Sequence, residues 1–221
     1  LLHGVTSSGK TEVYIHLIAN ALRDGHNVLY LVPEIALTTQ LTDRLRAVFG
    51  QQLVVYHSRF TNAERVEIYY QVAHSRIPLV IIGARSAIFL PFSSLGIVIV
   101  DEEHESSYKQ QDPAPRYHAR STAIIMARLF AAKVLLGTAT PSIETYHNAL
   151  TGKYGLVQMQ ERYQGLQLPR ITMIDLQRQY HRKEMYGHFS DPLVLRMREE
   201  IARGKQIILF QNRRGYAPFL Q

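Results

Sequence analysis

Short apolar runs alternate with amphipathic stretches along the first 150 residues of the chain. The runs are continuous, without a polar residue at every second position, as expected of parallel strands buried on both faces of a sheet. They cover residues 27–32, 53–57, 78–82, 96–100 and 133–137. The stretches predicted to form helices cover about residues 10–24, 35–48, 61–75, 117–131 and 141–149. This alternation predicts an α/β fold with an open, doubly wound parallel sheet, in which ligands bind at the carboxyl ends of the strands.

After residue 150 the chain becomes polar and loses a clear helical period. A helix is predicted to begin near Asp191, with Pro192 suited to its first turn, and a strand is predicted to follow at residues 205–211. The expected division is a first domain at residues 1–150, a connecting segment with one or two extended pieces at 151–189, and the start of a second α/β domain at 190–221.

Composition narrows the class of protein only modestly. Of the 221 residues, 46% are hydrophobic and 19% are charged, which is typical of a soluble globular protein. No apolar run approaches the roughly 18 residues of a membrane span, so no membrane partner is expected. The net charge of +7 weakly favours a polyanionic partner. The absence of cysteine excludes a disulfide framework or a cysteine zinc site in this chain and makes a cytoplasmic location natural, and the ten histidines show no metal-ligand spacing.

The stretch "GVTSSGKT" matches the phosphate-loop pattern G-x-x-x-x-G-K-[ST]. Its glycines let the backbone curl so that N–H groups point at phosphate oxygens, Lys10 suits the β- and γ-phosphates, and the hydroxyl of Thr11 suits Mg²⁺. A chance turn is the alternative, and the helix predicted to follow the loop argues against it. The predicted ATP-binding residues are Gly4, Val5, Thr6, Ser7, Ser8, Gly9, Lys10 and Thr11. Because a phosphate loop normally follows a strand and only residues 1–3 precede it, we expect the chain to be a segment of a longer protein.

The run "GIVIVDEEH" delivers acidic residues to a strand end. Asp101 can hold the Mg²⁺ shell, and Glu102 can orient or deprotonate an attacking water. The alternative is a solvated acidic helix start, and the phosphate loop upstream favours the Mg–ATP interpretation. The predicted catalytic and metal-binding set is Asp101, Glu102, Glu103 and His104.

The stretch "GTATPS" follows the apolar run at residues 133–137. Its small hydroxyl residues can hydrogen-bond the acidic pair and pass changes in phosphate contacts to neighbouring loops. A tight turn before a helix is the alternative interpretation. The predicted coupling residues are Gly137, Thr138, Ala139 and Thr140.

Together these three motifs resemble those of superfamily-two helicases. The segments "LVPEIALTTQ", "GARSAIFLPF", "DEEHESSYKQQ" and "NRRGYAP" narrow the resemblance to the bacterial replication-restart helicases, the family of primosomal protein N′. The resemblance is collinear over essentially the whole chain. It implies a RecA-like ATP-binding lobe at residues 1–150, the truncated start of a second such lobe at 190–221, and a 3′→5′ DNA helicase that assembles the primosome at stalled forks using ATP and Mg²⁺.

The resemblance also implies DNA contacts. In such helicases the loops along the DNA path hold phosphates, while aromatic faces stack on unpaired bases beside lysine and arginine. The matching positions are Pro33, Glu34, Arg85, Ser86, Tyr108, Lys109, Arg116, Tyr117, Arg120, Arg213 and Arg214. Arg85 could instead cap a helix or form a salt bridge, and the tyrosines could instead pack beneath a loop. The second-lobe arginines could touch either nucleotide or DNA.

By the same resemblance, the partners are single-stranded and forked DNA, replication-restart proteins and single-stranded-DNA-binding protein, in a bacterial, nucleoid-associated cytoplasmic location. The family's zinc-binding cysteines lie beyond "NRRGYAP", so zinc is expected only outside this chain. With most of the second lobe absent, we expect the segment alone to bind ATP but to hydrolyse little of it. Ser7 replaces a glycine usual in the family, and ATP binding would weaken if this position needs a positive φ. The alternatives are a nucleotide-gated scaffold, another superfamily-two DNA translocase, a small-molecule phosphotransferase or a transporter ATPase.

Overall fold

The computed structural model describes residues 1–57, 59–165 and 169–210. The chain separates into two units, Leu1–Gln167 and Leu168–Gln221, and each is described by itself. The predicted contacts of Arg213 and Arg214 lie outside the described residues. Among the described residues, no helix combines the length and the apolar character needed to cross a membrane.

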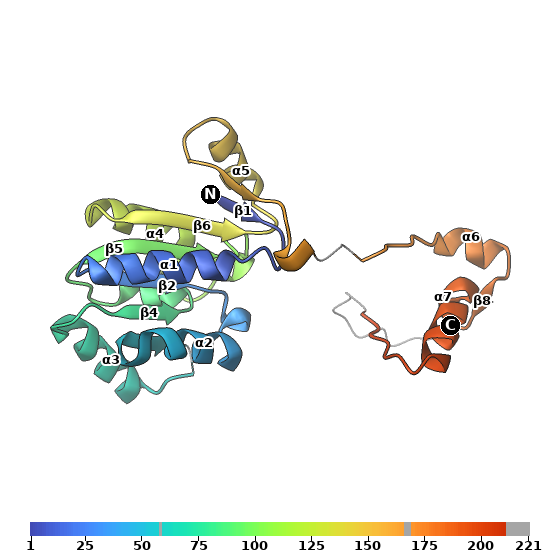
Figure 1. Ribbon diagram of the computed structural model, residues 1–221, viewed down its shortest axis with the longest axis horizontal. Coiled ribbons are helices and arrows are strands. Elements are labelled where there is room, and N and C mark those ends of the chain that lie inside the picture. Colours follow the sequence, from blue (N-terminus) through green and yellow to red (C-terminus); the bar gives the residue numbers. More distant parts are fainter. Residues whose placement is uncertain (58, 166–168, 211–221) are drawn as a thin grey trace. The chain divides into compact units, whose positions relative to one another are not determined.

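A parallel sheet forms the centre of the first unit (Figure 1). Its strand order is β3-β4-β2-β5-β6-β1-β7, and every pair of neighbours is parallel. The strands are β1 (Leu2–Gly4), β2 (Asn27–Leu31), β3 (Leu53–Tyr56), β4 (Val80–Gly83), β5 (Leu95–Asp101), β6 (Lys133–Thr138) and β7 (Val157–Met159). This arrangement confirms the predicted α/β class and the parallel sheet.

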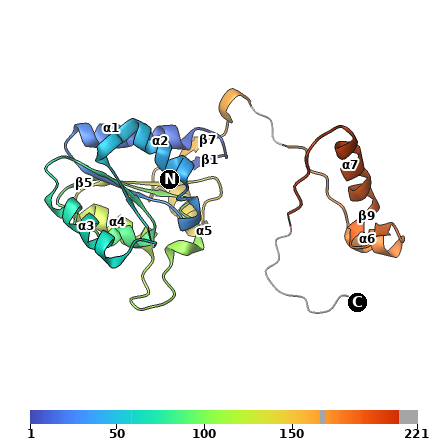
Figure 2. The same ribbon diagram turned by 90° about the horizontal axis from the view of Figure 1, so that it is seen from below.

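Helices cover both faces of this sheet, as Figure 2 shows. The helices are α1 (Lys10–Arg23), α2 (Thr39–Phe49), α3 (Asn62–His74), α4 (Ala119–Leu129) and α5 (Ile143–Leu150). Side chains of α1 and α2 pack with one set of sheet residues, which includes Val28 and Tyr30, and those of α3, α4 and α5 pack with the other, which includes Leu29 and Leu31. Successive strand residues are therefore buried on opposite faces, which explains why the apolar runs do not alternate.

Short 3₁₀ helices follow several strands or helices. They are η1 (Glu34–Ala36), η2 (Gly50–Gln52), η3 (Arg85–Phe89), η4 (Ser106–Tyr108) and η5 (Tyr163–Gly165). Side chains cap two of the helix starts. Thr61 and Glu64 form a reciprocal capping box ahead of α3, and the side chain of Ser142 accepts a hydrogen bond from the backbone of Thr145 in α5.

Strand β7 comes from the segment predicted to connect the two domains. It pairs with β1, with Leu2 opposite Val157 and Gly4 opposite Met159. Its contribution to the sheet was not anticipated, because three residues of mixed polarity carry no strand signal until a neighbouring strand offers its backbone. The pairing brings the residues after Met159 next to the phosphate loop.

The described residues of the second unit, 169–210, form two helices and a short antiparallel pair of strands. These elements are α6 (Leu176–His181), β8 (Met185–Tyr186), β9 (Phe189–Ser190) and α7 (Asp191–Ala202). Helix α7 begins as predicted, with Pro192 in its first turn, and Gly204 just beyond it has a φ of 72°.

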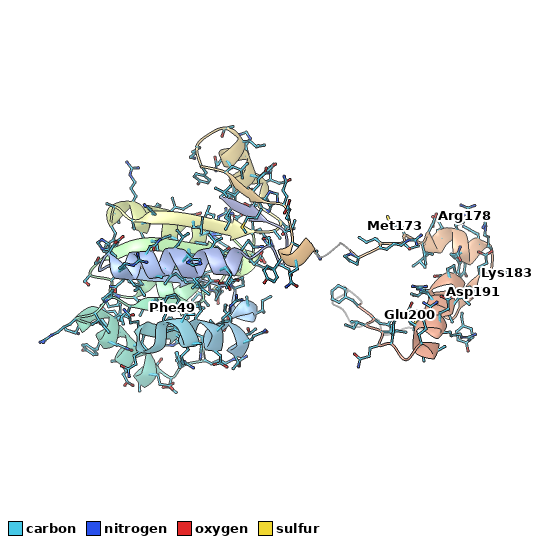
Figure 3. All side chains as sticks on the ribbon, viewed as in Figure 1. Phe49, Met173, Arg178, Lys183, Asp191 and Glu200 are labelled. Carbon is cyan, nitrogen blue, oxygen red and sulfur yellow. The ribbon has the colours of Figure 1, made fainter. Side chains whose placement is uncertain are left out.

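The strand predicted at residues 205–211 is wrong for the described residues 205–210, which form no strand. The backbone groups of a strand need a neighbouring strand as hydrogen-bond partner, and no strand in the described part of this unit pairs with residues 205–210. Lys205, at the start of this segment, forms an ion pair with Glu200 of α7 at 3.2 Å. Glu200, labelled in Figure 3, also pairs with Arg196 and Arg203 at 2.8 and 3.2 Å.

Gly83, at the end of β4, is expected to be intolerant of any side chain. A Cβ at this position would lie 2.5 Å from the backbone oxygen of Tyr56 and 2.8 Å from Cβ of Ala87. We expect Gly83→Ala to lower the free energy of unfolding by about 1–3 kcal/mol in chemical denaturation. Gly155→Ala is the matched control, because nothing lies within 4 Å of a Cβ there. Equal losses in the two variants would contradict the steric explanation.

Candidate nucleotide site

The predicted phosphate loop joins the end of β1 to the start of α1. Gly9 has a φ of 91°, which favours glycine, and a Cβ on Gly4 would lie 2.7 Å from Oγ of Ser8, so the loop is tightly curled between them. Nζ of Lys10 donates to the backbone oxygens of Gly4 and Val5 at 2.7 and 3.3 Å. The loop therefore places a lysine ammonium group and the unpaired N–H groups of a helix start together, which favours an anion.

Ser7 has a φ of 64°, in the left-handed region that favours glycine. The serine that replaces the family's usual glycine therefore stands at a position with a positive φ. The backbone oxygen of Ser7 accepts a hydrogen bond from the N–H of Tyr163 at 2.8 Å, which helps to hold the conformation.

Asp101 ends β5 and is held by two buried phenols. Tyr14 of α1 donates to its Oδ1 at 2.9 Å, and Tyr30 of β2 donates to its Oδ2 at 3.3 Å. Burial raises the pKa of Asp101, against the opposing effect of the Tyr14 hydrogen bond. Burial, together with the charge of Asp101, also raises the pKa of both tyrosines, so the two hydroxyls remain donors.

The hydroxyl of Thr138 links the acidic strand end to the predicted coupling stretch. It donates to Oε2 of Glu102 at 3.2 Å and accepts from the backbone N–H of Thr140 at 3.0 Å. Nδ1 of His104 lies 2.8 Å from Oγ1 of Thr138. Glu102, His104 and Thr140 therefore share one hydrogen-bonding centre, whereas Ala139 between the two threonines is half-buried.

Glu103 differs in its surroundings from its neighbours in the predicted catalytic and metal-binding set. Its side chain is 0% exposed and accepts from Nη1 of Arg120 at 2.6 Å, from the backbone of Ser142 at 2.7 Å and from Oγ1 of Thr145 at 2.8 Å. Burial acts to raise the pKa of Glu103, but these hydrogen bonds outweigh it and hold the pKa below its ordinary value. These contacts give Glu103 a structural role at the start of α5, and its predicted catalytic role stays a prediction.

The predicted loop and the acidic pair meet at one open cavity of ≈ 660 Å³. The cavity is lined by residues 6–12, Arg44, Asp101, Glu102 and Tyr163. Two of these were missed from sequence. Arg44 forms an ion pair with Glu12, and Tyr163 comes from the polar stretch that offered no motif. No sequence signal identifies either residue, because both reach the cavity through tertiary packing.

Several predicted DNA-contact residues make contacts within the protein, in or near the loop that follows His104. Tyr108 is 1% exposed, and its hydroxyl donates to the backbone oxygens of Leu31 and Asp101 at 3.1 and 2.6 Å. Its ring is therefore buried, as in the alternative that this tyrosine packs beneath the loop. Arg120 likewise forms an ion pair with the buried carboxylate of Glu103, and its predicted DNA contact stays a prediction.

The remaining candidates differ in exposure. Arg116 and Glu34 are exposed, Pro33 is buried, and the others are half-buried, namely Arg85, Ser86, Lys109 and Tyr117. Arg85 donates to the backbone oxygens of Ser107 and Lys109 at 3.3 and 3.2 Å, so it shapes this loop. The ring of Tyr117 packs edge-on against that of Phe89 with centroids 4.8 Å apart.

The ion pair between Arg120 and Glu103 should contribute strongly to stability. We expect Arg120→Ala to cost about 3–5 kcal/mol in urea unfolding at pH 7, because it leaves a buried carboxylate uncompensated. The matched control Arg116→Ala, at an exposed position, should change stability by about 0.5 kcal/mol or less. Since the folded-state pKa of Glu103 is lowered, its contribution is full above the ordinary value of 4.5 and is lost as the pH falls through the lowered value. A cost that persists unchanged at low pH would contradict this assignment.

Ser7 should carry backbone strain that glycine relieves. We expect Ser7→Gly to raise the free energy of unfolding by about 0.5–1 kcal/mol and to tighten nucleotide binding, as measured by denaturation and calorimetric titration. Ser7→Ala is the control, because alanine keeps the penalty for the φ of 64°. A gain in stability from alanine equal to that from glycine would show that strain is not the cause.

Comparisons with known proteins give the chain a family. The sequence pattern of the DEAD/DEAH box helicases matches residues 1–149. Over 220 residues, the chain is 43% identical to replication restart protein PriA of Bacillus subtilis and 44% identical to that of Rickettsia conorii, covering 100% of itself but 27% and 33% of those proteins. Among solved structures, RecG bound to a three-way DNA junction shares the fold, with a TM-score of 0.53 and 21% identity over 75% of this chain and 21% of that one. These matches confirm the resemblance to replication-restart helicases, and the chain belongs to the DEAD/DEAH box helicase family.

Proposed function

We propose that this chain is the ATP-binding part of a 3′→5′ DNA helicase of replication restart. The observation that carries the proposal is the single cavity lined by Lys10, Asp101 and Glu102, with Thr138 joining its acidic wall to the stretch after β6. The identity to replication restart proteins along the whole chain supports it further. Because the chain spans 27% and 33% of those relatives, helicase activity, DNA substrates and protein partners belong to this proposal.

The chemistry assigned to the site is ATP hydrolysis. Lys10 and the start of α1 bind the β- and γ-phosphates, and Glu102 orients the attacking water and accepts its proton. Thr11, Asp101 and Glu102 line the cavity, and their side chains carry the hard oxygen ligands that suit Mg²⁺, which usually takes one or two carboxylates together with substrate phosphates. When bound, Mg²⁺ would neutralise part of the negative charge of the phosphates. Among the described residues, no group of three histidine or acidic side chains forms a metal site made of protein ligands alone.

Thr138 is proposed to couple hydrolysis to movement. Its hydroxyl contacts Glu102, which faces the cavity, and the backbone of Thr140 in the loop after β6. A change in the position of Glu102 on loss of the γ-phosphate therefore alters the hydrogen bonding of that loop. We further propose that DNA lies at the carboxyl edge of the sheet near Arg116 and Tyr117, and that residues 190–221 open a second RecA-like lobe.

Two alternatives remain distinguishable from this proposal. A nucleotide-gated scaffold would recruit replication proteins, including single-stranded-DNA-binding protein, without needing hydrolysis. Another superfamily-two DNA translocase would use the same ATP site without acting in replication restart. A Lys10→Ala variant that kept full restart function in cells would favour the scaffold, and DNA-stimulated hydrolysis without any restart defect would favour the other translocase.

The proposal predicts that single-stranded or forked DNA raises ATP turnover by the full-length protein that carries this chain. We expect Thr138→Val to lower the DNA-stimulated rate about 10–100-fold, the effect of losing one hydrogen bond to a charged group in the transition state. Thr138→Ser keeps the hydroxyl and should keep most of the rate. Turnover that is indifferent to DNA in the unaltered protein would refute the motor function.

A further inference from the structure

Residues 159–163, which we call the loop strap, are bound to the phosphate loop at three successive points. The backbone N–H of Val5 donates to the oxygen of Met159 at 3.1 Å, and the N–H of Tyr163 donates to the oxygen of Ser7 at 2.8 Å. Nη2 of Arg162 donates to Oγ1 of Thr6 at 3.2 Å. The loop strap therefore runs alongside residues 5–7 of the phosphate loop, and the backbone of Tyr163 is fixed beside Ser7.

The side chain of Tyr163 remains open to the site although its backbone is fixed. The residue is 69% exposed and lines the same cavity as Lys10 and Asp101. Among the described residues that line this cavity, it is the one aromatic residue. A tyrosine ring offers a large, rigid face with few rotatable bonds, so it can bind a flat partner at a small cost in conformational entropy.

We propose that Tyr163 forms the nucleoside wall of this site, packing its ring against the base of the bound nucleoside triphosphate. Charged groups of Lys10, Asp101 and Glu102 suit the phosphates and their metal, whereas the base is the planar part of the ligand and needs an aromatic or apolar face. The cavity volume of ≈ 660 Å³ accommodates a ligand of this size. The inference rests on the proposed ATP site and adds to it a residue that selects a nucleotide over bare phosphates.

The absence of tryptophan from the chain allows a direct test. Tyr163→Trp introduces a single fluorescent reporter, and we expect ATP to quench its emission while inorganic tripolyphosphate, which lacks a base, does not. In calorimetric titrations, Tyr163→Ala should weaken ATP binding about tenfold and leave tripolyphosphate binding unchanged, because stacking contributes about 1.4 kcal/mol. Tyr163→Phe keeps the ring and should bind ATP as the unaltered chain does.

Tyr70→Ala is the matched control, because this tyrosine of the same unit is 59% exposed on α3 and does not line the cavity. Lys10→Ala should weaken both ligands, which separates phosphate contact from base contact. If Tyr163→Ala weakens ATP and tripolyphosphate equally, the residue acts through the loop and the base contact is refuted. If it weakens neither, the inference fails while the ATP site stands. If the unaltered chain binds neither ligand, the proposed function fails as well.

Discussion

The carboxylate of Asp101 is the point at which the elements of the site are joined. Tyr14 reaches it from the helix that follows the phosphate loop, and Tyr30 reaches it from the neighbouring strand β2. The contact depends on Gly137, which lies opposite Asp101 in β6, because a Cβ there would collide with the hydroxyl of Tyr14. The glycine that opens "GTATPS" is thus required by the close approach of Tyr14. One hydrogen-bonded carboxylate fixes the relative positions of the phosphate loop, the acidic strand end and the coupling stretch.

The sequence predicted the layout of this site well for a physical reason. Strands buried on both faces are continuous apolar runs, so the strand predicted at 27–32 was found at Asn27–Leu31 and that at 96–100 at Leu95–Asp101. Parallel strands place their carboxyl ends at one edge, and Asp101 and Glu102 therefore reach the same cavity as Lys10. Periodicity and topology together suffice for this result, without knowledge of individual side-chain contacts.

The contacts that sequence did not reveal have a common cause, which is that burial and pairing depend on partners distant in sequence. Glu103 and Arg120 are charged residues beside a catalytic motif, yet they bind each other because α5 closes over them. By residue type Tyr108 suits stacking on a base, but in the fold its hydroxyl donates to the backbone at the ends of β2 and β5. The segment at 205–210 lacks a neighbouring strand, whereas the less apolar Val157–Met159 has one in β1. Residue type alone does not distinguish these cases.

Strain lies at the two places where the site meets the rest of the chain. Ser7 and Glu102 have φ angles of 64° and 45°, which side-chain-bearing residues rarely adopt. Each is held by hydrogen bonds from outside its own turn, Ser7 by the N–H of Tyr163 and Glu102 by the hydroxyl of Thr138. Such conformations persist only where the surroundings over-determine them, and they are readily released when a contact changes. Under the proposed function, phosphate contacts act on both residues, so a change of nucleotide reaches the loop strap through Ser7 and the coupling stretch through Glu102.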